Sequence, residues 1–141
     1  MRRESRCERR RGQRGQSLVE MALVLPLLMI LLVGVVDVGR ALFTKIAITN
    51  ASREGARYAS RFPADKPGAI DAVRDELELN GLDSGLVDVT IDPDPAGNWL
   101  KGLPITVSLT YPYGTILGGI IGMGEIEIGA TTEMIVYGVG D

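Results

Sequence analysis

The strongest constraint in this sequence is an apolar run near its N-terminus. The 16 residues from Met21 to Val36 contain no charged side chain, and the apolar stretch as a whole covers the 21 residues 18–38. In an α-helix, 21 residues at about 1.5 Å each span roughly 31 Å, which matches the hydrocarbon thickness of a bilayer. Such a run leaves no polar face for a small soluble domain. We therefore expect one membrane-spanning helix.

The distribution of charge sets the direction of this helix. Residues 1–15 hold seven Arg and two Glu, a net charge of +5, whereas the whole chain carries −3. Basic residues mark the cytoplasmic flank of a membrane helix. We therefore expect residues 1–15 in the cytoplasm and residues 40–141 outside, with the chain crossing the cytoplasmic (inner) membrane once. A basic leader before an acidic body indicates a lipid bilayer as partner, and no nucleic acid.

A cleaved secretory signal also begins with basic residues and an apolar run. Here the run is long for such a signal, no Ala-x-Ala-like site follows it, and a helical pattern continues directly beyond Asp37. We therefore expect the segment to stay in the mature protein. The alternative, a secreted enzyme or soluble factor, predicts a mature chain that starts near Ala41.

The composition argues against catalysis. The chain has no histidine and one cysteine, Cys7, which lies in the basic leader. Without His a Ser-His-Asp site is impossible, and one Cys forms neither an intramolecular disulfide nor a Cys-based metal cluster. We expect a protein that is not an enzyme, with no cofactor, no metal and no small-molecule substrate.

Glu20 is the residue that a plain membrane anchor does not need. A carboxylate at the centre of a bilayer costs roughly 2.5–3.5 kcal/mol on insertion scales, and less near the interface. Two simple explanations are open: Glu20 lies among the lipid headgroups, or it ends the S-x-x-E capping box that begins at Ser17.

A third explanation comes from the spacing between Gly15 and Glu20. A glycine with Glu at the fifth following position, directly before an apolar helix, resembles the site that a prepilin peptidase cuts after the glycine. By this resemblance cleavage would fall between Gly15 and Gln16. The new α-amino group of Gln16 would then need a partner in an apolar environment, and Glu20 of a neighbouring subunit would supply it.

The resemblance extends over residues 14–60, which are similar to the TadE-like family. The similarity rests on the G-Q-x-x-V-E opening, a proline in the apolar helix, an acidic residue before Gly-Arg, and a closing R-E-G-A-R-Y-A. Beyond Gly15, Gln16 and Glu20, the family-motif residues are Asp37, Gly39, Arg40, Arg53, Glu54, Gly55, Ala56, Arg57 and Tyr58.

This resemblance implies a structural minor pilin, or pseudopilin, of the Tad/Flp tight-adherence type IV pilus. Its implied partners are a prepilin peptidase, other pilin subunits and the Tad assembly platform. Processing would place the chain in an extracellular pilus or at its base, and the sequence leaves open whether it enters the fibre, caps it or primes assembly. The rival class is a permanently membrane-anchored extracytoplasmic binding module that is never cut.

The rest of the chain predicts an α+β fold of type IV pilin-like form. Apolar residues at helical spacing continue the first helix to about Ser60, before Pro63. A short helix fits Ala69–Leu79, and two-residue alternation predicts three antiparallel strands whose apolar face packs on residues 48–62. The expected divisions are a leader (1–15), a transmembrane helix (16–38), an amphipathic helix (39–62) and an extracytoplasmic α+β region (63–141).

One glycine-rich segment, residues 112–124, interrupts the strands and carries four large aliphatic residues, Ile116, Leu117, Ile120 and Ile121. We expect it to be a flexible connection that tucks these side chains against the domain. The alternative is an exposed apolar loop that contacts another pilin or a surface, because exposed apolar patches mark interfaces.

Overall fold

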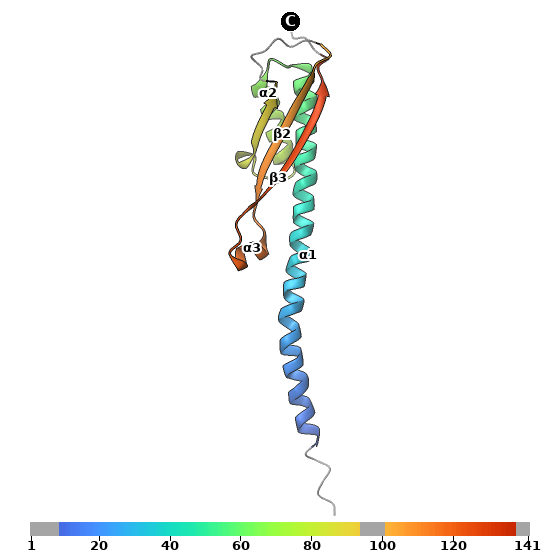
Figure 1. Ribbon diagram of the computed structural model, residues 1–141, viewed down its shortest axis with the longest axis vertical. Coiled ribbons are helices and arrows are strands. Elements are labelled where there is room, and N and C mark those ends of the chain that lie inside the picture. The colour runs from blue at the N-terminus through green and yellow to red at the C-terminus, as the bar shows by residue number, and fades with distance from the viewer. Residues whose placement is uncertain (1–8, 94–100, 138–141) are drawn as a thin grey trace, which may run out of the picture.

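The computed structural model describes residues 9–93 and 101–137 and confirms the α+β fold, a long helix on a small antiparallel sheet (Figure 1). In chain order the elements are α1 (Arg9–Arg61), α2 (Lys66–Leu79), the 3₁₀ turn η1 (Ser84–Leu86), β1 (Asp88–Asp92), β2 (Pro104–Tyr113), α3 (Ile116–Ile121) and β3 (Ile126–Ile135).

Helix α1 runs unbroken for 53 residues and has two environments. Its C-terminal half packs against the rest of the chain, whereas most of its N-terminal half projects below both the sheet and α3 (Figure 1). All residues from 15 to 32 are exposed, although most are apolar. Pro26 lies inside the continuous helix, and α1 ends at Arg61, two residues before Pro63. In length and composition α1 fits a single-pass membrane anchor.

Helix α2 starts three residues earlier than the sequence pattern predicts. Asp65 is its N-cap, and a side-chain oxygen of this residue accepts the N–H of Gly68. Pro67 in the first turn has a fixed φ that suits a helix start. The helix ends as expected, with Asn80 as C-cap and Gly81 at a φ of 72°.

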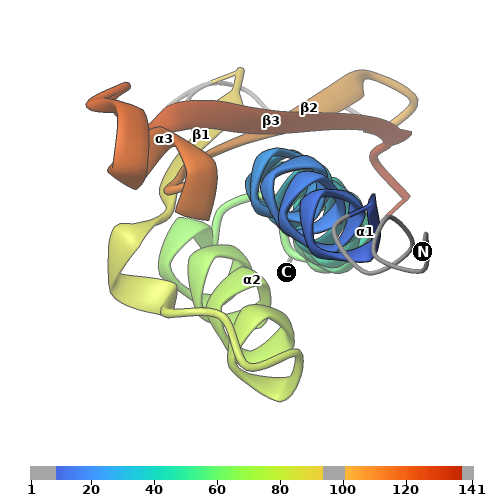
Figure 2. The ribbon, with the colours of Figure 1, turned by 90° about the horizontal axis from the view of Figure 1, so that it is seen from below.

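The three strands form one antiparallel sheet in the order β1-β2-β3. In the central strand every second side chain is buried, namely Ile105, Val107, Leu109, Tyr111 and Tyr113. Figure 2 shows that α1 and α2 both lie on one side of the sheet, so the fold has a helical layer and a sheet layer. The predicted helix-on-sheet packing is confirmed.

The core lies where small residues of α1 meet α2 and the sheet. Ala51, Gly55, Ala56 and Ala59 are buried on α1, and Val73 of α2 is completely buried against them. Small side chains let the two helices and the sheet approach closely, and apart from Ile48 of α1 the larger aliphatic residues of the core come from the other elements. The α+β unit is therefore built around the C-terminal half of α1.

The prediction that residues 112–124 tuck their aliphatic side chains against the domain is wrong. The first two residues of this segment end β2, and Ile116–Ile121 form the short helix α3 at the lower end of the sheet (Figure 1). Leu117 is half-buried, but Ile116, Ile120 and Ile121 are 43%, 71% and 59% exposed. The reason is geometric: α3 extends beyond the end of the core, where α1 is its neighbour and α2 does not reach (Figure 1).

Candidate functional site

The residues predicted to carry function lie at three levels along α1. The Gly15–Glu20 segment is near its free end, Asp37 and Arg40 lie where the sheet begins, and residues 53–58 are inside the domain. The three groups are therefore separate, and the fold does not gather them into one pocket. Within residues 9–93 and 101–137, no three His, Cys, Asp or Glu side chains are placed to hold a metal ion.

At the first level, Gln16 and Glu20 lie one helical turn apart on the exposed surface. The Nε2 of Gln16 donates to Oε1 of Glu20 at 3.4 Å, a long hydrogen bond. The helix continues through this segment from Arg9, so Ser17 is not an N-cap, and the capping-box explanation of Glu20 is wrong for the uncut chain.

Gly15 occupies open space. A Cβ added there would meet no heavy atom within 4 Å. Packing therefore gives no reason for a glycine at this position. Glycine lowers helix stability by roughly 1 kcal/mol relative to alanine, so Gly15 makes local unwinding easier and leaves its backbone accessible.

At the second level, Asp37 binds the start of α3. Its side chain is buried, and its two carboxylate oxygens accept the backbone N–H groups of Ile116 and Leu117 at 2.9 and 2.8 Å. These N–H groups have no partner within α3 because they belong to its first turn. Asp37 thus joins two segments about 80 residues apart and satisfies two backbone donors at once.

Two further contacts support this junction. The Tyr113 hydroxyl donates to the backbone oxygen of Asp37 at 3.1 Å. The Arg40 guanidinium lies 3.9 Å from Asp37 Oδ1 and 5.7 Å from the centroid of the Tyr113 ring, where a cation–π attraction operates. In the structure, Asp37 and Arg40 therefore stabilise the junction between α1 and α3. Gly39 is exposed with open space around it, and nothing in the structure explains a glycine there.

At the third level, Gly55 and Ala56 are packing residues. Both are buried, and a Cβ on Gly55 would lie 2.4 Å from Cγ2 of Val73. No real Cβ approaches a carbon that closely, so only glycine fits between α1 and α2 at this point. Replacement by any other residue requires Val73 or α2 to move.

Tyr58, also at this level, joins α1 to the start of α2. Its hydroxyl donates to Asp65 Oδ2 at 2.7 Å, and its ring lies 5.2 Å from that of Phe62. The Tyr58 bond, together with the Gly68 N–H, lowers the pKa of Asp65. In return, the hydrogen bond to Asp65 raises the pKa of Tyr58. Asp65 therefore serves as N-cap and inter-helix acceptor together.

The charged residues of the third level behave differently. Arg53 and Arg57 are exposed, and Arg57 Nη2 pairs with Glu54 Oε1 at 2.6 Å across one helical turn. An exposed pair of this kind contributes about 0.2–1 kcal/mol. These arginines thus belong to a solvated face of α1.

Sequence reasoning missed two polar contacts that hold α1 to β3. Ser52 Oγ lies 2.7 Å from Thr132 Oγ1, and Lys45 Nζ donates to the backbone oxygen of Gly129. No sequence pattern identifies such partners, because they depend on the register of β3 over α1. Asp65 was identifiable in principle, since Asp followed by Lys-Pro is a typical helix start.

Comparison with known proteins adds one match. Residues 15–57 match the family model described as TadE-like protein, which confirms the resemblance seen in the sequence. The matched segment begins at Gly15 and includes most of α1 but no part of the sheet. No curated protein and no solved structure matches the chain.

Proposed function

Starting from the TadE-like match of residues 15–57, which points to a structural, Tad pilus-associated protein, we propose that this chain is a minor pilin, or pseudopilin. In this proposal a prepilin peptidase cuts between Gly15 and Gln16 on the cytoplasmic side of the inner membrane. The mature chain then takes part in assembly of a Tad/Flp-type adhesive pilus, with other pilin subunits and the Tad assembly platform as partners.

The shape of α1 supports a role as a subunit that packs through its first helix. Residues 15–32 of this helix are exposed throughout, and its apolar side chains from Leu18 to Val38 are mostly exposed. The helix is long and apolar enough to cross a membrane. The same surface that contacts lipid before assembly would contact neighbouring helices in a fibre.

The observation that carries the proposal is the unneutralised carboxylate of Glu20. Among the described residues the ion pairs are Asp37–Arg40 and Glu54–Arg57, and neither includes Glu20, whose carboxylate accepts a hydrogen bond from the neutral amide of Gln16. A charge inside an apolar bundle needs a counter-ion. After cleavage, the positively charged α-amino group of Gln16 in an adjacent subunit supplies this counter-ion.

N-terminal sequencing of the membrane fraction tests the cleavage. In cells that express the prepilin peptidase, the mature chain should begin at Gln16, and Gly15→Leu should leave the leader in place. Gly12→Leu, in the same leader, is the matched control and should be cut normally. An intact leader on the wild-type chain would overturn the proposal and favour a permanently anchored binding module.

Glu20→Gln tests assembly separately from cleavage. The variant keeps the size of the side chain and removes its charge, so it should be cut at the normal rate but accumulate in the membrane, with loss of pili and of surface attachment. Glu20→Asp, which keeps the charge, should retain part of the activity. Normal pilus production by Glu20→Gln would show that the carboxylate is incidental.

A further inference from the structure

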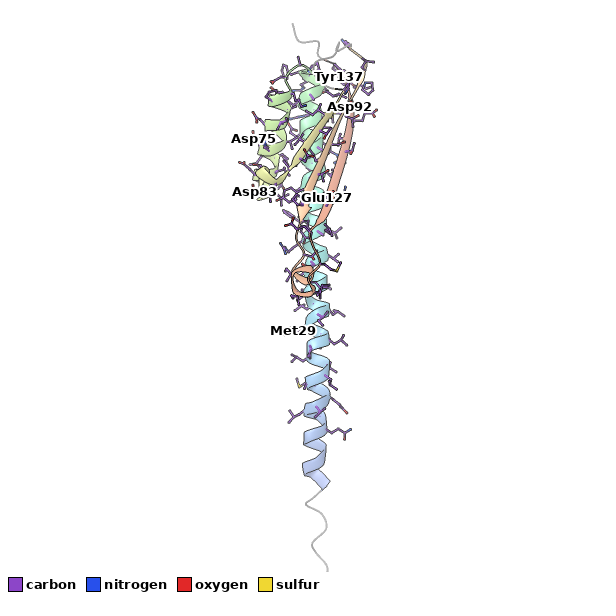
Figure 3. The ribbon with its side chains drawn as sticks, turned by 60° about the vertical axis from the view of Figure 1, so that its left-hand side comes forward. Met29, Asp75, Asp83, Asp92, Glu127 and Tyr137 are labelled. Atoms are coloured by element: carbon purple, nitrogen blue, oxygen red, sulfur yellow. The ribbon has the colours of Figure 1, made fainter. Side chains whose placement is uncertain are left out.

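The α3 segment lies beside the apolar part of α1, although it belongs to the extracytoplasmic region in the sequence. Asp37, to which its N-terminus is bound, directly follows the 16-residue uncharged run. Figure 3 shows α3 between the level of Met29 and the sheet. Residues 15–36 are all exposed apart from Val33 and Gly34, one turn before Asp37, which are partly covered.

The segment has the composition and backbone bonding that a lipid environment requires. Residues 114–124 contain no charged side chain, and the first charge beyond them is Glu125. Backbone groups at both ends of α3 form hydrogen bonds: Asp37 and Thr115 accept N–H groups at the N-terminus, and the Gly118 carbonyl oxygen accepts the Met123 N–H at the C-terminus. Unsatisfied backbone groups exclude irregular loops from hydrocarbon, and each of these bonds removes such a group.

The outward face of α3 is apolar and uncovered within the chain. Ile120, Ile121 and Met123 are 71%, 59% and 64% exposed, and Ile116 is 43% exposed. The other residues of the stretch 118–124 are glycines, so no polar side chain lies among Ile120, Ile121 and Met123 in the sequence. Helix α3 contacts α1, whose apolar side chains before Asp37 are themselves mostly exposed.

We propose that α3 and the turn after it (residues 114–124) insert into the outer leaflet of the bilayer, as a second membrane contact beside α1. The inference rests on the proposed insertion of α1, which puts Asp37 at the outer boundary of the hydrocarbon. Asp37, Arg40 and Glu125 then form the polar limit, and the uncharged patch lies below it. The partner is the interfacial zone of the lipid, because a segment fixed at the depth of a membrane helix meets lipid before any other molecule.

This arrangement has a consequence for assembly. Extraction of a subunit into a fibre must withdraw α3 from lipid together with the span, because Asp37 holds the two together. It also fixes the tilt of the domain, since two contacts restrict rotation that a single helix would allow.

Nitroxide depth measurement tests the proposal on the full chain. In a Cys7→Ser background, single variants Ile120→Cys, Met29→Cys and Asp83→Cys are spin-labelled and reconstituted at high dilution into phosphatidylcholine/phosphatidylglycerol vesicles. The ratio of the relaxation of the spin label by oxygen to its relaxation by a water-soluble nickel chelate gives the depth of the label in the bilayer. Position 29 is the membrane control, and the exposed position 83, in the loop after α2, is the water control.

The expected result is a label at 120 that is protected from nickel, at a depth between those of 29 and 83. If 29 is protected and 120 is as accessible as 83, the second contact is wrong while the membrane span stands. If the label at position 29 is also accessible to nickel, α1 is not inserted, and both the membrane span and the second membrane contact are refuted. Protection at 120 that disappears on further dilution of protein in lipid would indicate a second copy of the chain, which also overturns the proposal.

Discussion

Gly55 offers the sharpest test of how the family motif shapes the fold. A methyl group placed on Gly55 would lie 2.4 Å from Cγ2 of Val73, and 3.5 Å from both the Ala69 oxygen and Val107 Cγ1. Val73 is completely buried and its side chain is β-branched, so it cannot rotate away freely. Gly55→Ala therefore forces α1 and α2 apart.

The magnitude follows from two opposing effects. Overpacking a well-packed core costs typically about 1–3 kcal/mol. Replacing glycine by alanine inside a helix returns about 1 kcal/mol. Because the clash is with a stiff, buried side chain, we expect a net loss of about 1–2 kcal/mol in the free energy of unfolding.

The assay is urea unfolding of the full chain in a mild detergent, followed by near-ultraviolet circular dichroism of the buried tyrosines Tyr111 and Tyr113. Gly39→Ala is the matched control on the same helix, with open space at its Cβ, and should not lower stability. In a Val73→Ala background, Gly55→Ala should cost little, because the clashing methyl group is gone. A Gly55→Ala variant as stable as the wild type would refute the packing argument.

Three further predictions concern polar contacts. Asp37→Ala removes the acceptor of two backbone N–H groups, which should cost about 1–3 kcal/mol locally, and hydrogen exchange should show faster exchange at the first two amides of α3 while the sheet core stays protected. Because the pKa of Asp65 is lowered from 3.8, its contribution to stability is complete above that value and is lost as pH falls through the folded-state pKa. Because the pKa of Tyr58 is raised from 10.0, its contribution is present below pH 10 and is lost as pH rises further. Tyr58→Phe should therefore flatten both limbs of a stability–pH profile. Arg57→Ala breaks only an exposed pair with Glu54 and should change stability by less than about 1 kcal/mol; a loss of pili in that stable variant would identify the exposed arginines as a subunit contact.

The motif residues between Asp37 and Tyr58 could be identified from the sequence, but their roles became clear only in the structure. In the sequence these residues stand out only by resemblance, and their roles are not visible. In the structure Asp37, Gly55 and Tyr58 each contact a segment from elsewhere in the chain, namely α3, α2 and the α2 cap. Much of the motif is thus explained by folding, and Glu20, with no such contact, remains the candidate for assembly.

Local patterns determined the elements of this protein. The uncharged run from Met21 to Val36 required a long helix, Pro63 ended it, and two-residue alternation specified three strands. These signals are local because helix and strand periods repeat within a few residues. The tertiary structure alone decided the position of α3, which the sequence led us to expect against the domain. Its depth beside the apolar span depends on a bond between Asp37 and two amides about 80 positions later, and no local pattern encodes a contact over that separation.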